Sequence, residues 1–219
     1  MGGIAVFGVI LFFFISGYLV SQSWAQKPSW LAFIRKRFIR IVPGLAGCLI
    51  FTVLLGAALT TLPALAYWQS EELPAYLLKN LLLQNYLPLP GVFASNPVAA
   101  VVNGSLWTIS VEASCYLGLM ALGLLGALAT PARAVSVLVL TLVGAMLWGQ
   151  HVNLFRAMVV HAALPGYYAA FVCGALVFLM RTYLPRSVPI TLALMLASLL
   201  LPPHPFTYVL SQMMLGVSL

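Results

Sequence analysis

The sequence predicts an all-α protein: a polytopic bundle of transmembrane helices, with about six full spans and a partial seventh. Hydrophobic residues make up 63% of the 219 residues and charged residues only 6%, whereas a soluble domain carries about 25% charged residues. The mean hydropathy is +1.08. Apolar stretches long enough to cross a hydrocarbon core of ~30 Å recur along the chain. Lipid is therefore expected to be the main solvent of this protein.

Helix-breaking and polar residues divide the apolar sequence into expected spans at residues 3–23, 43–62, 105–128, 135–150, 164–180 and 188–201. A last apolar stretch, 206–219, is too short to cross. Pro43 is expected in the first turn of its span, where a missing N–H costs nothing. Residues 73–86 predict an amphipathic, interfacial helix that ends before the turn signals of Pro88–Pro97. Residues 1–219 are expected to form a single domain.

The basic residues predict how the spans are oriented. Ten Lys and Arg residues against three Glu and no Asp give a net charge of +7. When the links between spans are assigned alternately to two sides, one side receives eight basic residues: Lys27, Arg35, Lys36, Arg37, Arg40, Arg133, Arg181 and Arg186. The other side receives Lys79 and Arg156. The richer side is expected to be cytoplasmic.

Nucleic-acid binding is not expected, because these basic residues lie between apolar stretches, where membrane topology explains them. A metal site has no support either. The three cysteines lie inside apolar segments, and the histidines lack the spacing of metal ligands.

Glu112 is the sharpest candidate for a functional side chain, because it lies in the otherwise apolar expected span 105–128. An ionisable group at membrane depth costs ~2.5–3.5 kcal/mol, so it usually faces a cavity or a partner. The alternatives are a solvated position near the interface or a simple pairing with an arginine. Ser105, at the start of this span, is expected to cap the helix.

The basic run Arg35, Lys36, Arg37 and Arg40 is the second candidate, in a link expected from Lys27 to Arg40. Arg37 and Arg40 are three residues apart, so in a helix they share one face. Guanidinium groups bind phosphate through paired hydrogen bonds. The alternative is a cytoplasmic loop that interacts with anionic lipid.

The pair Ser16-Gly17, in the middle of the first span, is the third candidate. Small residues at this depth are typical of close helix packing. They also allow a ligand to approach the backbone. Glu112 is expected to face the bundle interior beside Ser16-Gly17, because Gly17 lets the two helices approach closely.

Three sequence blocks follow one another in a specific order: GVILFFFISGYL at residues 8–19, RKRFIRIVP at 35–43, and NLLLQN at 80–85 followed by SLWTISVE at 105–112. Together they resemble the membrane-bound acyltransferase 3 family, which O-acylates sugars and other envelope components. The resemblance covers roughly residues 5–120, with Lys36 in place of one motif arginine; the later helices fit by hydropathy alone.

The resemblance implies an O-acyltransferase with many spans in a bacterial inner (plasma) membrane. The donor would be an acyl-CoA, most often acetyl-CoA, approached from the cytoplasm, and no bound cofactor is implied. The acceptor would be a hydroxyl of a carbohydrate or a lipid-linked glycan. Arg35, Lys36, Arg37 and Arg40 would lie near the donor phosphates. The remaining implied substrate-binding residues are Ser16, Gly17, Asn85, Ser105 and Trp107.

The sequence also departs from the family pattern. The helix that precedes the FFxxSG helix in the family holds a histidine proposed as the catalytic base, and this sequence starts at Met1, just before the FFxxSG helix. Ala113 and Ser114 replace the Glu-Gln that usually follows Glu112. Glu112 is then expected to orient or replace the histidine. The chain is interpreted as a member shortened at both ends. Open alternatives are an inactive fragment and a transporter or channel-like bundle without catalysis.

Overall fold

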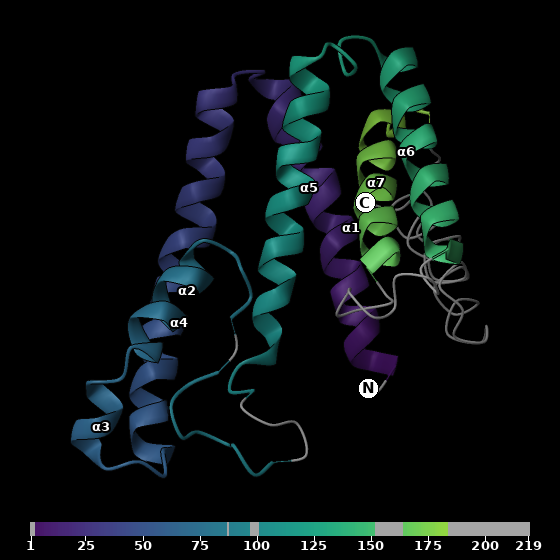
Figure 1. Cartoon of the computed structure of the whole chain (residues 1–219). Helices are drawn as coiled ribbons and strands as arrows, with labels where there is room; N and C mark the ends of the chain where they lie inside the picture. Colours follow the sequence, from purple (N-terminus) through teal and green to yellow (C-terminus); the bar gives the residue numbers. More distant parts are fainter. Residues whose placement is uncertain (1–2, 87, 97–100, 152–163, 184–219) are drawn as a thin grey trace. The chain divides into compact units, whose positions relative to one another are not determined.

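The computed structural model of the chain describes residues 3–86, 88–96, 101–151 and 164–183 (Figure 1). These residues form helices and no strand, which confirms the all-α prediction. The helices are α1 (Gly3–Gln26), α2 (Trp30–Leu59), α3 (Ala64–Trp68), α4 (Glu72–Leu81), α5 (Trp107–Leu124), α6 (Pro131–His151) and α7 (Leu164–Met180), with a 3-10 turn, η1 (Gly104–Leu106), before α5.

Three of the described helices have the length and composition of membrane spans. Gly8–Gln26, Trp30–Leu59 and Gly104–Leu124 are long and apolar enough to cross a bilayer, and Pro131–Gly144 and Gly166–Met180 are shorter apolar helices. The helical membrane bundle predicted from the sequence is therefore confirmed. The expected spans at 188–201 and 206–219 lie outside the described residues.

The expected loop from Lys27 to Arg40 is wrong, because α2 begins at Trp30 and continues through the whole basic run. Pro43 consequently lies inside α2 and not in its first turn. A proline removes one backbone hydrogen bond from a helix. The other residues keep theirs, and in lipid every backbone polar group needs an internal partner. The helix therefore continues to Leu59.

Turn chemistry moves several other predicted boundaries. The interfacial helix predicted at 73–86 is found as α4 but ends at Leu81, because Leu83 and Asn85 adopt positive φ angles of 61° and 52°. α5 ends at Leu124, four residues earlier than predicted, since Gly126 takes the left-handed conformation (φ 72°). α6 starts at Pro131, where a proline suits the first helical position.

The chain forms two compact units, Met1–Phe33 with Cys115–Leu219 and Ile34–Ser114. In the first unit α7 packs against both α1 and α6. The contact between α1 and α7 is close because each helix presents a glycine to the other's backbone. A Cβ atom on Gly17 would overlap the Phe171 carbonyl, and one on Gly174 would overlap the Phe14 carbonyl and lie 2.9 Å from the Tyr18 nitrogen. The Ser16-Gly17 segment therefore makes the small-residue helix contact that the sequence suggested.

Helices α1, α5 and α7 run in the same direction within the first unit, as the order of their contacts shows: Phe13 with Tyr167, Tyr18 with Phe178, Ser16 with Tyr116, and Trp24 against Gly123. Their C-terminal ends therefore lie at one end of the unit. Lys27 follows α1, Arg133 lies in the first turn of α6 after α5, and Arg181 follows α7. For these three residues the structure agrees with the predicted charge asymmetry.

The second unit has its own core, formed by the C-terminal part of α2, the short helices α3 and α4, and the segment that leads to α5. Its buried side chains are Leu45, Leu49, Val53, Tyr67, Leu73, Tyr76, Leu89, Val92 and Leu106. The Tyr67 hydroxyl donates a hydrogen bond of 2.7 Å to the Val53 carbonyl. Gly56 leaves room for it, because a Cβ atom there would lie 2.6 Å from that hydroxyl. This core anchors the chain segment that leads into α5.

Replacing Gly174 by alanine should destabilise the protein, because the added methyl group meets helix backbone and not a movable side chain. We expect a loss of about 1–3 kcal/mol, the usual cost of overpacking, seen as a lower melting temperature in mild detergent.

The matched control is Gly118→Ala in α5, where a Cβ atom meets nothing within 4 Å. Alanine there should leave stability unchanged or raise it by up to ~1 kcal/mol. Equal melting temperatures for both variants would contradict the close contact between α1 and α7.

Candidate active site

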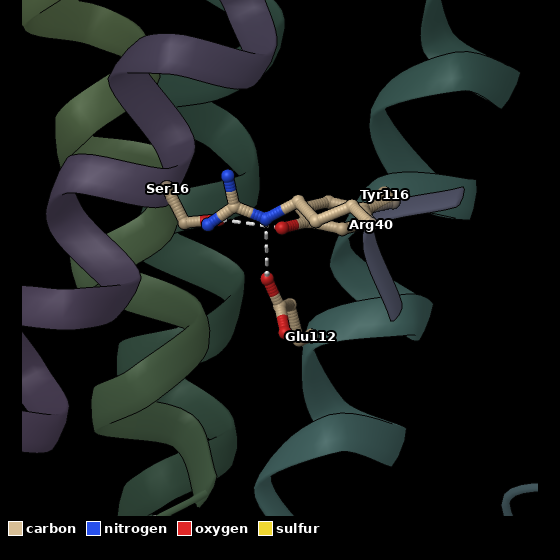
Figure 2. A network of polar contacts seen from close by, with 4 residues as sticks. All are labelled: Ser16, Arg40, Glu112 and Tyr116. Atoms are coloured by element: carbon tan, nitrogen blue, oxygen red, sulfur yellow. Dashed lines mark hydrogen bonds and ion pairs between the residues drawn. The ribbon is translucent and has the colours of Figure 1, made fainter. Parts of the chain in front are cut away.

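An ion pair between Arg40 and Glu112 joins α2 and α5 within the second unit (Figure 2). Arg40 Nε lies 3.8 Å from Glu112 Oε1, which is ion-pair distance but too long for a hydrogen bond. The Glu112 side chain is 9% exposed and the Arg40 side chain 50%. A solvated position of Glu112 near the interface does not fit this burial. Pairing with an arginine, the other alternative, does fit the structure. A nearby cation offsets the cost of burying the carboxylate.

The helical course of α2 confirms that Arg37 and Arg40 share a face. Arg37 is half-buried, whereas Arg35 and Lys36 are exposed. The basic run therefore does not form one uniform surface, and its members differ in what surrounds them.

Asn103, which sequence reasoning missed, caps η1, the 3-10 turn that leads into α5. Its Oδ1 accepts hydrogen bonds from the Ser105 backbone N–H (3.2 Å) and from the Ser105 hydroxyl (2.6 Å). The prediction that Ser105 caps the helix is wrong, because Ser105 lies inside η1 and its hydroxyl donates to the Asn103 side chain that caps this turn. Asn103 Nδ2 also lies 3.2 Å from Cys48 Sγ, a contact that links the cap to α2. Trp107, half-buried, is the first residue of α5.

A tight turn after α4 places Asn85 against α5. Asn80 is buried, and its side chain bonds the Tyr76 carbonyl (2.9 Å), the Tyr86 carbonyl (2.6 Å) and the Tyr86 N–H (3.0 Å). Asparagine tolerates the left-handed conformation found at Asn85. The Ser110 hydroxyl lies 2.7 Å from Asn85 Oδ1. Asn85 thus contacts α5 at Ser110, which precedes Glu112 by two residues.

Ser16 pairs with Tyr116 in the first unit (Figure 2): their hydroxyl oxygens lie 3.0 Å apart and both side chains are buried. Sequence reasoning missed Tyr116. The available signal was its position four residues after Glu112, which puts both side chains on one face of α5. Glu112 belongs to the second unit and Ser16 to the first, so their expected proximity stays a prediction. The backbone that lies closest to Gly17 is that of α7 at Phe171, while α5 contacts α1 at the adjacent Ser16 through Tyr116.

Two buried tyrosines of the second unit are poor candidates for a base. Burial raises the pKa of both Tyr67 and Tyr76, which lie outside the spans, above the usual value of 10. Their hydroxyls therefore stay protonated at neutral pH. Glu112 remains the carboxylate of the site.

Comparison with known proteins identifies the family. A family model described as an acyltransferase domain, Acyl_transf_3, matches residues 1–216. The chain belongs to the acyltransferase 3 family. It is 35% identical over 116 residues to an O-acetyl transferase of Shigella phage Sf6, a match that covers 53% of this chain and 33% of the phage protein.

A second relative is the acyltransferase MdmB of Streptomyces mycarofaciens. It is 33% identical over 124 residues, with 53% of this chain and 27% of the relative covered. The matches thus span a third or less of the length of these relatives. No solved structure matches the chain.

Replacing Asn80 by alanine should loosen the turn that carries Asn85. The substitution removes three hydrogen bonds from a buried position, and an unsatisfied buried group costs about 1–3 kcal/mol. We expect a lower melting temperature than for the wild type in the same detergent. The exposed Asn96 provides the control, because Asn96→Ala removes an amide that the core does not use. A normal melting temperature for Asn80→Ala would show that the turn holds without this side chain.

Proposed function

We propose that this chain supplies part of the active site of a membrane O-acyltransferase. The enzyme moves an acyl group, typically acetyl, from acyl-CoA to a hydroxyl of a carbohydrate or lipid-linked glycan in a bacterial inner membrane. Family membership supports acyl transfer, and it favours a catalyst over the transporter alternative. The O-acetyl transferase name of the phage relative supports oxygen as the acceptor atom.

One structural observation carries the proposal: the buried carboxylate of Glu112 and the half-exposed side chain of Arg40, which come from two of the sequence blocks that resemble the family, meet in an ion pair. Burying a carboxylate in an apolar helix costs free energy, which a cation beside it offsets, and a leucine of similar size would carry no such cost. A reaction that needs a fixed hydrogen-bond acceptor beside a phosphate-binding cation explains why the pair is there.

In the proposed reaction the acceptor hydroxyl oxygen attacks the thioester carbonyl carbon of the donor. A new C–O bond forms, the C–S bond breaks, and the hydroxyl proton passes through a general base to the departing CoA sulfur. Glu112 accepts a hydrogen bond from the acceptor hydroxyl, or from the base, and so sets the direction of attack. Arg40 holds Glu112 in place.

Arg37 and Arg40 bind the donor phosphates in this proposal. An arginine has five N–H donors in a planar fork. The Arg40 atom that faces Glu112 is Nε. The two Nη groups of Arg40 can therefore donate to a phosphate oxygen in this proposal. Half of the Arg40 side chain is exposed, which leaves a path for a ligand. The arginine would then couple donor binding to the orientation of Glu112.

Replacing Glu112 by glutamine tests the central group, because shape is kept and charge is lost. In the whole enzyme, Glu112→Gln should lower kcat by about 100-fold, the cost expected when a reacting group is no longer held in the correct position. Membrane insertion and abundance should stay normal. Glu71→Gln, at an exposed site at the start of α4, is the matched control and should leave kcat unchanged.

A double variant separates catalysis from simple pairing. If Glu112 only partners Arg40, the variants Glu112→Gln and Arg40→Gln should have equal effects, and their combination should add nothing. In our proposal Glu112→Gln lowers kcat more than Arg40→Gln does. Wild-type activity of Glu112→Gln would remove Glu112 from the mechanism.

Replacing both Arg37 and Arg40 by glutamine should raise the KM for acyl-CoA. The physical reason is the loss of charge-assisted hydrogen bonds to phosphate, each worth about 1.5–3 kcal/mol. Steady-state kinetics with varied acyl-CoA would measure the change. An unchanged KM for acyl-CoA, together with normal membrane insertion, would show that Arg37 and Arg40 do not bind the donor.

A further inference from the structure

The continuous helix α2 places the members of the basic run on different faces. Successive residues of an α-helix are turned by roughly 100°, so Arg37 and Arg40 lie within roughly 60° of each other, while Arg35 is turned roughly 140–160° away from both. Because α2 is unbroken from Trp30 to Leu59, this angular relation holds in the structure. A flexible loop would not impose it.

The two faces have different surroundings. On the face of Arg37 and Arg40, Phe33 is buried and Arg40 pairs with Glu112. On the opposite face, the neighbours one turn before and one turn after Arg35 are apolar and exposed. They are Leu31 (63% exposed), Phe38 (59%) and Ile39 (59%). Arg35 is thus the cation in the middle of an exposed apolar surface.

The position of Arg35 along α2 corresponds to the headgroup layer. From Ile41 to Leu59 the helix has no charged residue. These residues extend roughly 28 Å at 1.5 Å per residue, which matches a hydrocarbon core of ~30 Å. Arg35 lies more than one turn before this apolar part, near the N-terminal end of α2, which Lys27 precedes. Exposed Leu, Phe and Ile side chains around it are suited to lipid and not to water.

We infer that Arg35 binds the phosphate of an anionic phospholipid headgroup and does not contact the acyl donor. Its guanidinium can reach outward along the helix while its methylenes stay among the apolar neighbours. Guanidinium matches phosphate geometry, and the apolar neighbours accept the acyl chains of the same lipid. The basic run then has two roles: Arg37 and Arg40 bind the acyl donor, and Arg35 binds the lipid headgroup.

Titration of the purified whole protein with phosphatidylglycerol or phosphatidylcholine, followed by native mass spectrometry, tests this inference. Arg35→Gln should weaken phosphatidylglycerol binding about fivefold, as expected for one basic residue at an anionic surface. Binding of phosphatidylcholine should not change. Arg35→Lys keeps the charge and should retain most of the affinity, which controls for folding. Arg40→Gln, on the opposite face, should leave the affinity for phosphatidylglycerol unchanged.

A competition experiment distinguishes the two sources of phosphate. Coenzyme A should not displace phosphatidylglycerol, because the donor is assigned to the other face. Unchanged phosphatidylglycerol affinity of Arg35→Gln, or displacement by coenzyme A, would overturn the inference. So would a rise in the acyl-CoA KM of Arg35→Gln as large as that of the Arg37 and Arg40 double variant. The lipid titration needs no turnover, so it remains decisive even if acyl transfer is not the activity.

Discussion

A buried carboxylate in an apolar helix needs a cation nearby, and the pairing of Glu112 with Arg40 satisfies this need. The requirement constrains both helices of the second unit that contribute to the pair. α2 must be helical as far back as Arg40 to present the guanidinium, and α5 must begin early enough to bury Glu112 in its second turn. Asn103 caps η1, the turn that leads into α5, and its contact with Cys48 links this turn to α2. The local geometry of α2 and α5 therefore depends on the ion pair between Arg40 and Glu112.

Asn80, Asn85 and Ser110, which lie in the sequence blocks that resemble the family, support this arrangement through short-range contacts. Asn80 holds the turn after α4, and Asn85 in that turn meets Ser110 on α5. The left-handed backbone at Leu83 and Asn85 is tolerated because the buried Asn80 amide bonds both sides of the turn. Such a turn restricts where the first turns of α5 can lie. These contacts bring Ser110 to Asn85, 25 residues away in the sequence, and so join the turn after α4 to α5.

In the first unit the main constraint is the close packing of helices. Lipid provides no hydrophobic driving force for this packing, so it depends on small residues that let the backbones approach. Gly17 and Gly174 let the backbones of α1 and α7 approach, and the aromatic pair Phe13 and Tyr167 stacks beside them. The buried hydroxyls of Ser16 and Tyr116 satisfy each other in an apolar setting. These contacts give the motif segment around Ser16-Gly17 a structural role that is independent of any ligand.

Composition and hydropathy by themselves determined that the protein is a helical membrane bundle, because its few charges indicate a lipid environment and its long uninterrupted apolar stretches have the length of membrane-spanning helices. The sequence also singled out Glu112 and the face shared by Arg37 and Arg40, since an isolated charge and a three-residue spacing are local signals. Tertiary structure decided the rest. The partner of Glu112 lies 72 positions away in the sequence, Tyr116 meets Ser16 across 100 positions, and α7 is the helix that fills the space at Gly17. Which side chains meet depends on how the helices pack, and helical periodicity specifies a face but not the neighbour that covers it.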